Sequence, residues 1–243
     1  MIMLDILKEI LAENQIEIDE NQLKRIDAYY ELLMEKNRVM DLTNITEPRE
    51  VALRHMADSL FLTKCADLKG KKVIDIGTGA GFPGMPLLMY DETLDITMVD
   101  STGKRIDFIN DSMGKIGDCN KATAITARAE DLGVDKKHRE KYDFVTSRAV
   151  APMNILAELT LPLLKVGGKF LAMKSANEEG EKELNDALFA IKTLGGKVVK
   201  TIDYQLASDC PNRRIVIIEK VKPTADAYPR KYAKIKSKPL GSK

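Results

Sequence analysis

The 243-residue chain has few of the residues that build disulfide frameworks, Cys/His metal centres or membrane spans. It contains three cysteines, two histidines and no tryptophan, and Cys65, Cys119 and Cys210 are widely spaced. This pattern excludes a disulfide framework and a Cys/His metal site, and it favours a reducing, cytoplasmic location. No stretch approaches the ~20 apolar residues of a membrane-spanning helix. The first ten residues carry charges within their apolar run, which indicates a helix rather than a secretion signal. We therefore expect no bound metal and no membrane association.

Net charge is also small, at +1, but it is unevenly distributed. Residues 1–70 carry 9 Lys/Arg against 14 Asp/Glu, residues 71–210 carry 19 against 21, and residues 211–243 carry 10 against 2. A basic C-terminal segment on a nearly neutral body indicates a polyanionic partner. Nucleic acid is favoured over a membrane because no amphipathic apolar face accompanies the charge. A merely solubilising tail is the alternative.

Hydrophobic periodicity divides the chain into three segments. Residues 1–70 predict an N-terminal helical arm, because their apolar residues recur at helical spacing. Residues 71–222 alternate between short β-branched runs and amphipathic stretches, which predicts an α/β domain with a Rossmann-like, doubly wound sheet. Residues 223–243, with three prolines among lysines, are expected to be a basic, extended and mobile tail. Strands are expected at 73–76, 95–99, 122–127, 144–147, 169–173, 198–204 and 214–219, with helices near 84–90, 103–116, 152–165 and 177–194.

Polar residues in the arm mark a helix start and a candidate site. Asp19 with Gln22 three residues later has the pattern of a capping box. Further along, a helix that begins near Pro48 would bring several polar side chains to one side. A solvated surface network is the alternative to a functional cluster. The polar residues concerned are Arg54, His55, Asp58 and Ser59.

The residues most informative about function follow the first predicted strand. Gly77, Gly79, Gly81 and Gly84 lie within eight residues, and such a loop lets the backbone approach a ligand that any Cβ would push away. The last three fit G-x-G-x-x-G, a weak signal of a dinucleotide site. Asp75, however, lies inside the strand two residues before Gly77, a pattern similar to motif I of the S-adenosylmethionine-dependent methyltransferases. A nucleoside-bearing ligand is expected, either S-adenosylmethionine or a nicotinamide dinucleotide.

The other candidate residues stand at the ends of later strands, where open parallel sheets bind their ligands. Asp100 ends the second strand and can accept both hydroxyls of a ribose, which serves either cofactor. Glu130, after the third strand, could read an adenine edge, although a charged surface turn is the alternative. Arg148 ends the fourth strand, where a methyl acceptor would lie, and we favour a functional role for it.

Taken together, these motifs resemble the bacterial small-subunit rRNA guanine-N7 methyltransferase family (RsmG, or glucose-inhibited division protein B) over nearly the whole chain. The glycine loop continues into Phe82-Pro83-Gly84, a feature specific to that family. Lys36, Asp41 and Ser175 depart from the family pattern, but they lie in the arm and after Lys174. The departures therefore do not touch the cofactor site. The segments that carry the resemblance are residues 37–43, 54–60, 75–84, 100–105, 147–149, 172–174 and 228–231.

The resemblance implies a fold, a cofactor and a partner. The fold is a class I methyltransferase sheet of seven strands, mostly parallel with an antiparallel last strand. The cofactor is S-adenosylmethionine, and the partner is 16S rRNA or the small ribosomal subunit. Expected cofactor contacts are Gly77, Gly79, Phe82, Asp100, Ala129, Glu130 and Arg148. Expected catalytic residues are Arg148, which would orient the pocket, and His55, Asp58 and Lys174, which would line its rim. Expected RNA contacts are Lys104, Arg105, Arg213, Arg214, Arg230 and Lys231.

The chemistry of guanine N7 agrees with this set of residues. N7 is a lone pair without a proton, so its methylation needs no general base and depends on in-line placement, which can be worth about 7–11 kcal/mol. An electronegative site would stabilise the positive charge that develops on the base. The alternatives are methylation of another RNA or nucleobase, an NAD-dependent oxidoreductase, and a non-catalytic RNA-binding module. A monomer is expected. Deletion of residues 223–243 is expected to weaken RNA binding and to spare cofactor binding.

Overall fold

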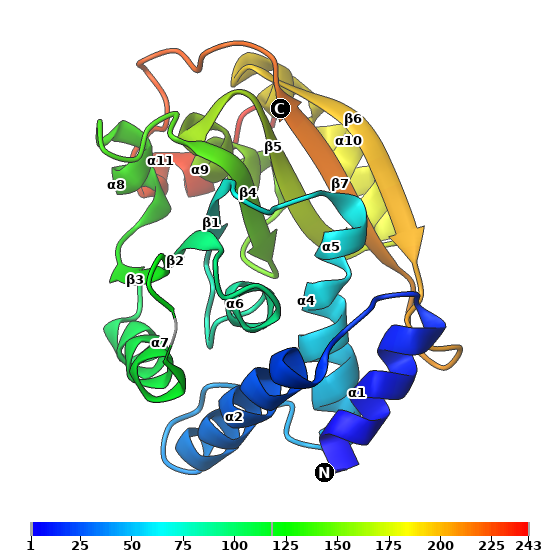
Figure 1. The fold of residues 1–243 in the computed structure, drawn as a ribbon. Coiled ribbons are helices and arrows are strands. Elements are labelled where there is room, and N and C mark those ends of the chain that lie inside the picture. Colours follow the sequence, from blue (N-terminus) through cyan, green and yellow to red (C-terminus); the bar gives the residue numbers. More distant parts are fainter. Residues whose placement is uncertain (1, 118, 243) are drawn as a thin grey trace.

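The computed structural model describes residues 2–117 and 119–242, and in this part of the chain a twisted seven-stranded sheet runs through the molecule (Figure 1). The strand order is β3-β2-β1-β4-β5-β7-β6. Neighbours from β3 to β5 pair in parallel, and β7 is antiparallel to both β5 and β6. The expected α/β class and the antiparallel last strand are confirmed. The strands are β1 (Lys72–Ile76), β2 (Asp95–Asp100), β3 (Thr123–Thr126), β4 (Tyr142–Arg148), β5 (Leu164–Ser175), β6 (Gly196–Tyr204) and β7 (Arg213–Lys220).

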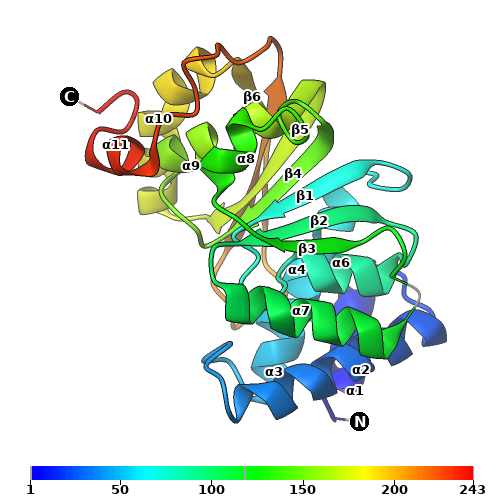
Figure 2. The same cartoon turned by 90° about the vertical axis from the view of Figure 1, so that its left-hand side faces the viewer.

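Helices cover both faces of this sheet (Figure 2). On one face lie α6 (Gly84–Tyr90), α7 (Gly103–Ile116) and the N-terminal arm. On the other lie α8 (Ala129–Val134), α9 (Met153–Thr160), α10 (Glu178–Thr193) and α11 (Tyr232–Ser237), with a short 3₁₀ turn, η2 (Leu161–Leu163), after α9. Successive strand residues point to opposite faces. Val73 therefore joins the core on the arm side, while Ile74 and Ile76 join the core under α8 to α10.

The arm begins with α1 (Ile2–Glu13) and α2 (Glu20–Asn37). The expected capping box is confirmed, since the Asp19 carboxylate accepts from the Gln22 backbone N–H at 2.8 Å and the Gln22 side chain accepts from the Asp19 N–H at 2.7 Å. The rest of the arm is a chain of short helical pieces. They are α3 (Pro48–Val51), the π-helix η1 (Ala52–Ala57), α4 (Asp58–Leu60) and α5 (Leu62–Cys65).

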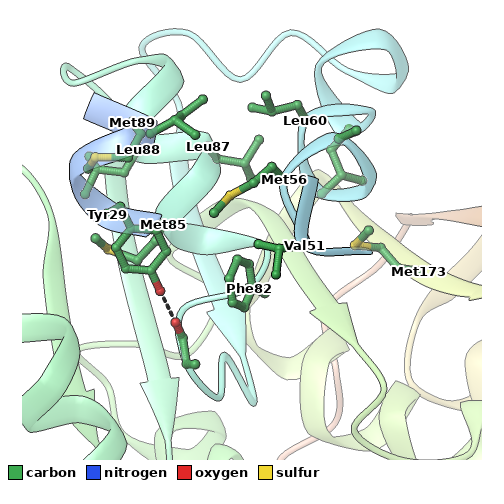
Figure 3. Close-up of a cluster of buried hydrophobic side chains, with 14 of the residues drawn as sticks. Tyr29, Val51, Met56, Leu60, Phe82, Met85, Leu87, Leu88, Met89 and Met173 are labelled. Atoms are coloured by element: carbon green, nitrogen blue, oxygen red, sulfur yellow. Dashed lines mark hydrogen bonds between the residues drawn. The ribbon is translucent and has the colours of Figure 1, made fainter. Parts of the chain in front are cut away.

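The arm shares one hydrophobic core with the glycine loop and α6 (Figure 3). Tyr29 of α2 and Met56 of η1 are fully buried there, beside Met85 and Leu88 of α6. The Tyr29 hydroxyl donates a hydrogen bond to the carbonyl of Ala80 in the glycine loop. Burying each such side chain stabilises the fold by roughly 1.5–3 kcal/mol. The arm is thus packed firmly against the loop that precedes α6.

The π-turn of η1 lies where the polar residues of the arm differ in burial. A π-turn adds a residue to the helical repeat and is often found at functional sites. His55 in η1 and Asp58 at the start of α4 are both buried, whereas Arg54, which is also in η1, is exposed. Helical spacing alone would have placed these three residues on one common side.

The C-terminal segment is folded, so the expectation of an extended tail is wrong. It forms α11, and Ile235 in that helix is fully buried beneath neighbouring apolar residues. Upstream, the Arg139 side chain donates hydrogen bonds to the backbone carbonyls of Thr224 and Tyr228. Such anchors come from residues distant in sequence, which local composition does not reveal. In the part of the chain that is described, no helix is long and apolar enough to cross a membrane.

Candidate functional site

Asp75 holds the glycine loop in place. Its carboxylate accepts hydrogen bonds from the Gly84 N–H at 3.1 Å and the Thr146 hydroxyl at 2.9 Å. The side chain is fully buried, and burial raises its pKa to about 6, although these hydrogen bonds act in the opposite direction. Asp75 therefore joins the start of α6 to β1 and β4. The residue that distinguishes motif I in the sequence has a structural role in shaping the loop.

The glycine loop leaves open space on the side that faces away from the core. Gly77 and Gly79 have φ values of +70° and +60°, in the left-handed region that other residues rarely adopt. A Cβ on Gly77 would lie 2.3 Å from Cγ2 of Val150, whereas a Cβ on Gly79 would meet no atom within 4 Å. The Gly79 N–H donates to Asp100 at 3.0 Å. Val150 thus closes the space beside Gly77, whereas the space beside Gly79 is open.

A cavity of about 260 Å³ lies at the carboxyl ends of β1, β2 and β3. Asp100 is nearly buried on its wall, and its two carboxylate oxygens accept from the Gly79 and Thr102 N–H groups. This fixes the carboxylate while leaving lone pairs for a ligand hydroxyl. Of the expected cofactor contacts, Gly77, Asp100, Ala129 and Glu130 line this cavity. The described lining also includes Val150, Leu159 and Tyr232, but it does not include Gly79, Phe82 or Arg148.

Arg148 ends β4 and joins the sheet to the arm. Its guanidinium donates to the Arg54 carbonyl, to Asp58 Oδ2 at 3.3 Å and to His55 Nδ1 at 3.1 Å. It also lies over the ring of Phe82, 5.1 Å from the ring centroid. The structure therefore brings together three of the four residues that were expected to be catalytic, around a guanidinium held from several directions.

His55 is neutral in this arrangement. Because an arginine can only donate, Nδ1 must accept from Arg148, so the ring proton is on Nε2 and is donated to Thr43 Oγ1 at 2.8 Å. Burial and the nearby Arg148 charge lower the pKa of His55 to about 3. The ring stacks on Phe82 with centroids 4.2 Å apart, and Asn37 holds the Thr43 backbone at 2.9 Å. Phe82 is thus covered by arm side chains rather than open to the cavity.

Asp58 is already saturated by donors. It accepts from Arg148, from Arg213 at 3.2 Å and from the Tyr204 hydroxyl at 2.7 Å. One carboxylate between two guanidinium groups gives this cluster a net charge of +1. Asp58 therefore supplies no uncompensated negative charge to a nearby ligand.

A second cavity, of about 230 Å³, opens beside this cluster. Its charged lining residues are Arg54, Asp58, Arg148 and Arg213. The rest is mainly apolar, with contributions from the arm and from the β6–β7 connection. Ala149 lines this cavity, and the next residue, Val150, lines the first one. Ala149 has a φ of +55°, a strained conformation for a residue with a side chain. Consecutive residues of the turn after β4 thus line the two cavities.

Comparison with known proteins assigns the family. A family model described as GidB, rRNA small subunit methyltransferase G, matches residues 22–208.

The chain belongs to the rRNA small subunit methyltransferase G family.

Its relatives are similar over nearly their full length. The "Ribosomal RNA small subunit methyltransferase G" of Desulforamulus reducens is 42% identical over 235 residues, which is 96% of this chain and 97% of that protein. The protein of the same name from Pelotomaculum thermopropionicum is 41% identical over 240 residues, 98% of this chain and 99% of its own. The Listeria welshimeri protein is 44% identical over 225 residues, 92% and 93% respectively.

Solved structures share the fold at low sequence identity. TYW2 of M. jannaschii in complex with AdoMet has a TM-score of 0.51 at 15% identity and covers 67% of this chain and 76% of its own. TrmN of Thermus thermophilus has a TM-score of 0.51 at 19% identity, covering 67% and 48%. These likenesses place the sheet among the class I methyltransferase folds. An NAD-dependent oxidoreductase is not favoured.

Lys174, the fourth residue expected to be catalytic in this family member, does not join the Arg148 cluster. Its ammonium group donates to the Ala151 carbonyl at 2.7 Å and to Glu183 at 2.6 Å, and the same Glu183 oxygen accepts from the Met153 N–H. In the sheet Arg148 pairs with Met173, so Lys174 is one residue further along and points to the opposite face. Lys174 therefore holds the turn after β4 from the α10 side.

The six residues expected to contact RNA divide into two groups. Arg213 is bound to Asp58, Arg214 to Asp203 at 2.6 Å and to Glu181, and Arg230 to Glu158. These three arginines are thus engaged by carboxylates of the protein itself, and Arg213 shares its carboxylate with Arg148. Lys104 and Lys231 are exposed, and Arg105 lies 3.6 Å from Asp100 at the mouth of the first cavity.

Three site residues escaped the sequence reasoning. Thr43 lies in the Leu-Thr pair that contributed to the family resemblance, so a signal for it existed. No local pattern predicts a role for Tyr204, which is only the last residue of an expected strand. Tyr232 belongs to the tail that was expected to be extended, and nothing in its neighbourhood indicated a cavity.

Proposed function

We propose that this chain transfers a methyl group from S-adenosylmethionine to N7 of a guanine in 16S rRNA. Family membership supports the reaction class and the partner. The observation that carries the assignment is the position of Arg148, which is fixed by the arm and lies at the turn shared by the two cavities. A cofactor in the first cavity and an acceptor base in the second would meet at that turn.

The residues of the first cavity suit the cofactor. The left-handed glycines leave room for its amino-acid end near Gly79, where a side chain would fill the open space. Asp100 is oriented to accept ribose hydroxyls, and Ala129 and Glu130 lie where the adenine would be. Bound there, S-adenosylmethionine supplies a sulfonium-activated methyl group. Phe82 contributes indirectly, by supporting the loop and Arg148.

The second cavity suits the acceptor base. Arg148 uses three of the five N–H donors of a guanidinium for the Arg54 carbonyl, Asp58 and His55, which leaves two without partners in the described residues. Guanine O6 is an acceptor next to N7, and Arg is the residue that most often reads this edge. Arg148 donating to O6 would orient the base while leaving the N7 lone pair free to attack.

The chain's residues perform this reaction by placement rather than by proton transfer. N7 carries no proton, and His55 has a partner on each ring nitrogen, so it is not available as a base. Because Asp58 is neutralised by its donors, the cluster gives no electronegative site for the developing charge. The rate enhancement then depends on holding N7 in line with the methyl group, an effect worth about 7–11 kcal/mol.

The RNA must present the base in an accessible form. The major groove of A-form RNA is deep and narrow, so a paired guanine would hide N7 and the target must be unpaired or extruded. Exposed Lys104 and Lys231, with Arg105 near the cavity mouth, are the charges placed to bind phosphates. A cytoplasmic monomer acting on 16S rRNA or the small subunit is the simplest form of this proposal.

The test is methyl transfer from labelled S-adenosylmethionine to unmethylated 16S rRNA and to small subunits. Reduction followed by aniline scission cleaves RNA at N7-methylguanine, so it reports both the atom and the nucleotide. Arg148→Ala should lower the rate by about a hundredfold, because misplacement of the base costs this much. Arg25→Ala removes an ion pair with Glu92 and a hydrogen bond to the Met89 carbonyl, outside the lining of both cavities, and should leave the rate unchanged. Label on another atom or RNA would overturn the substrate assignment, and an unimpaired Arg148→Ala enzyme would overturn the role of Arg148.

A further inference from the structure

The C-terminal helix reaches the cofactor cavity. Tyr232, the first residue of α11, lines that cavity together with Ala129 of α8 and Leu159 of α9. Its ring is partly exposed and lies under the guanidinium of Arg128, 5.7 Å from the ring centroid. Residues up to 103 positions apart in the sequence, Ala129 and Tyr232, thus form one wall. Figure 2 shows α11 beside α9, on the same side of the sheet as α8.

Strong anchors on either side of Tyr232 keep it at the cavity. Two residues earlier, Arg230 donates through Nε and Nη2 to both oxygens of Glu158, a fully buried carboxylate, and its N–H donates to the same group at 2.8 Å. Three residues later, Ile235 is fully buried. Breaking a buried ion pair of this kind is strongly destabilising, because it leaves an uncompensated charge inside the protein. The position of the ring is therefore set by the fold and not by chance contact.

The chemistry of the wall matches one end of the cofactor. Asp100 occupies the part of the cavity suited to the ribose, and the glycine loop occupies the part suited to the amino-acid end. Ala129, Leu159 and Tyr232 supply apolar and aromatic surface to the remaining wall, next to the charged residues Arg128 and Glu130. A purine ring is flat and has apolar faces, and such rings stack favourably against aromatic side chains.

We propose that Tyr232 is a cofactor-binding residue and that the C-terminal segment folds back to complete the adenine end of the site. This inference rests on the proposed function, since it takes the first cavity as the site of S-adenosylmethionine. It also revises the expected effect of a truncation. Removing residues 223–243 takes away Tyr232 as well as the exposed lysines, so it should weaken cofactor binding together with RNA binding.

The experiment is calorimetric titration of the full chain with S-adenosylhomocysteine. Tyr232→Ala should raise the Kd about tenfold, because the contact of the purine with an aromatic face is lost. Tyr232→Phe keeps that face and should bind within about twofold of wild type. Tyr232→Leu keeps apolar volume on the helix without the aromatic face, so it should bind like Tyr232→Ala while remaining folded. Ser237→Ala, on an exposed position of the same helix, is the matched control.

Kinetics give a second readout that a merely structural role would not produce. Tyr232→Ala should raise KM for S-adenosylmethionine and leave kcat near the wild-type value at saturating cofactor. Wild-type affinity in Tyr232→Ala, or an equal loss in Tyr232→Ala and Tyr232→Phe, would overturn the inference. Failure of the wild-type chain to bind S-adenosylhomocysteine would instead overturn the proposed function itself, so the two failures are distinguishable.

Discussion

Replacing His55 with glutamine should make the stability of this protein less sensitive to acid. His55 is buried, accepts a hydrogen bond from Arg148 on one nitrogen and donates to Thr43 from the other. Protonation would place a second positive charge against the Arg148 guanidinium. The folded protein resists this, and the pKa of His55 falls from 6.5 to about 3. Glutamine keeps a neutral side chain with a donor and an acceptor but cannot titrate.

The sign and size of the effect follow from that pKa. Between pH 6.5 and pH 3 the unfolded chain binds a proton at His55 that the folded chain does not, so folding free energy is lost as the pH falls. Between about pH 7.5 and pH 5, the free energy of unfolding falls by about 2 kcal/mol because of His55. For a chain of this size this corresponds to a fall in Tm of roughly 4–8 °C. Asp75 acts oppositely, because its raised pKa lets the folded state bind a proton first as the pH falls below about 6. Both proteins keep Asp75, so its contribution cancels in the comparison.

The assay is thermal unfolding followed by circular dichroism at several pH values in this range. The wild-type Tm should fall more steeply toward pH 5 than the Tm of His55→Gln, whatever the constant offset between them. His138→Gln removes the other histidine, keeps His55 and serves as the control for the slope. If His55→Gln lost as much stability as the wild type between pH 7.5 and pH 5, the neutral, doubly bonded state of His55 would be wrong.

Two further substitutions test the loops at the cavity. Ala149→Gly should raise the free energy of unfolding by about 1 kcal/mol in urea titrations, because Ala149 has a left-handed backbone; a loss of stability would contradict this strain. Gly77→Ala should reduce S-adenosylhomocysteine affinity by at least about tenfold, since its Cβ would lie 2.3 Å from a Val150 methyl group on a left-handed backbone. Gly114→Ala, in open space on α7, is the matched control and should bind normally.

Much of the sheet and its cavity could be predicted because the signals are local. Short β-branched runs locate the strands, since the hydrophobic period of each segment reflects the burial of that segment. Asp100 and the glycine loop could be assigned because parallel strands bring their carboxyl ends to one edge. Asp75 could be recognised as a motif residue, but its role as a buried link to Gly84 and Thr146 required the structure.

The sequence by itself determined the α/β class, the family, the glycine loop and the polar residues of the arm, because each depends on neighbours within a few positions. Only the tertiary structure decided which of those polar residues meet. His55 and Asp58 are buried whereas Arg54 stays exposed, and one step along β5 sends Lys174 to the opposite face from Arg148. The fold also gives Arg230 a buried partner and carries Tyr232 to the cavity. These outcomes depend on contacts between residues far apart in the chain, which no local pattern contains.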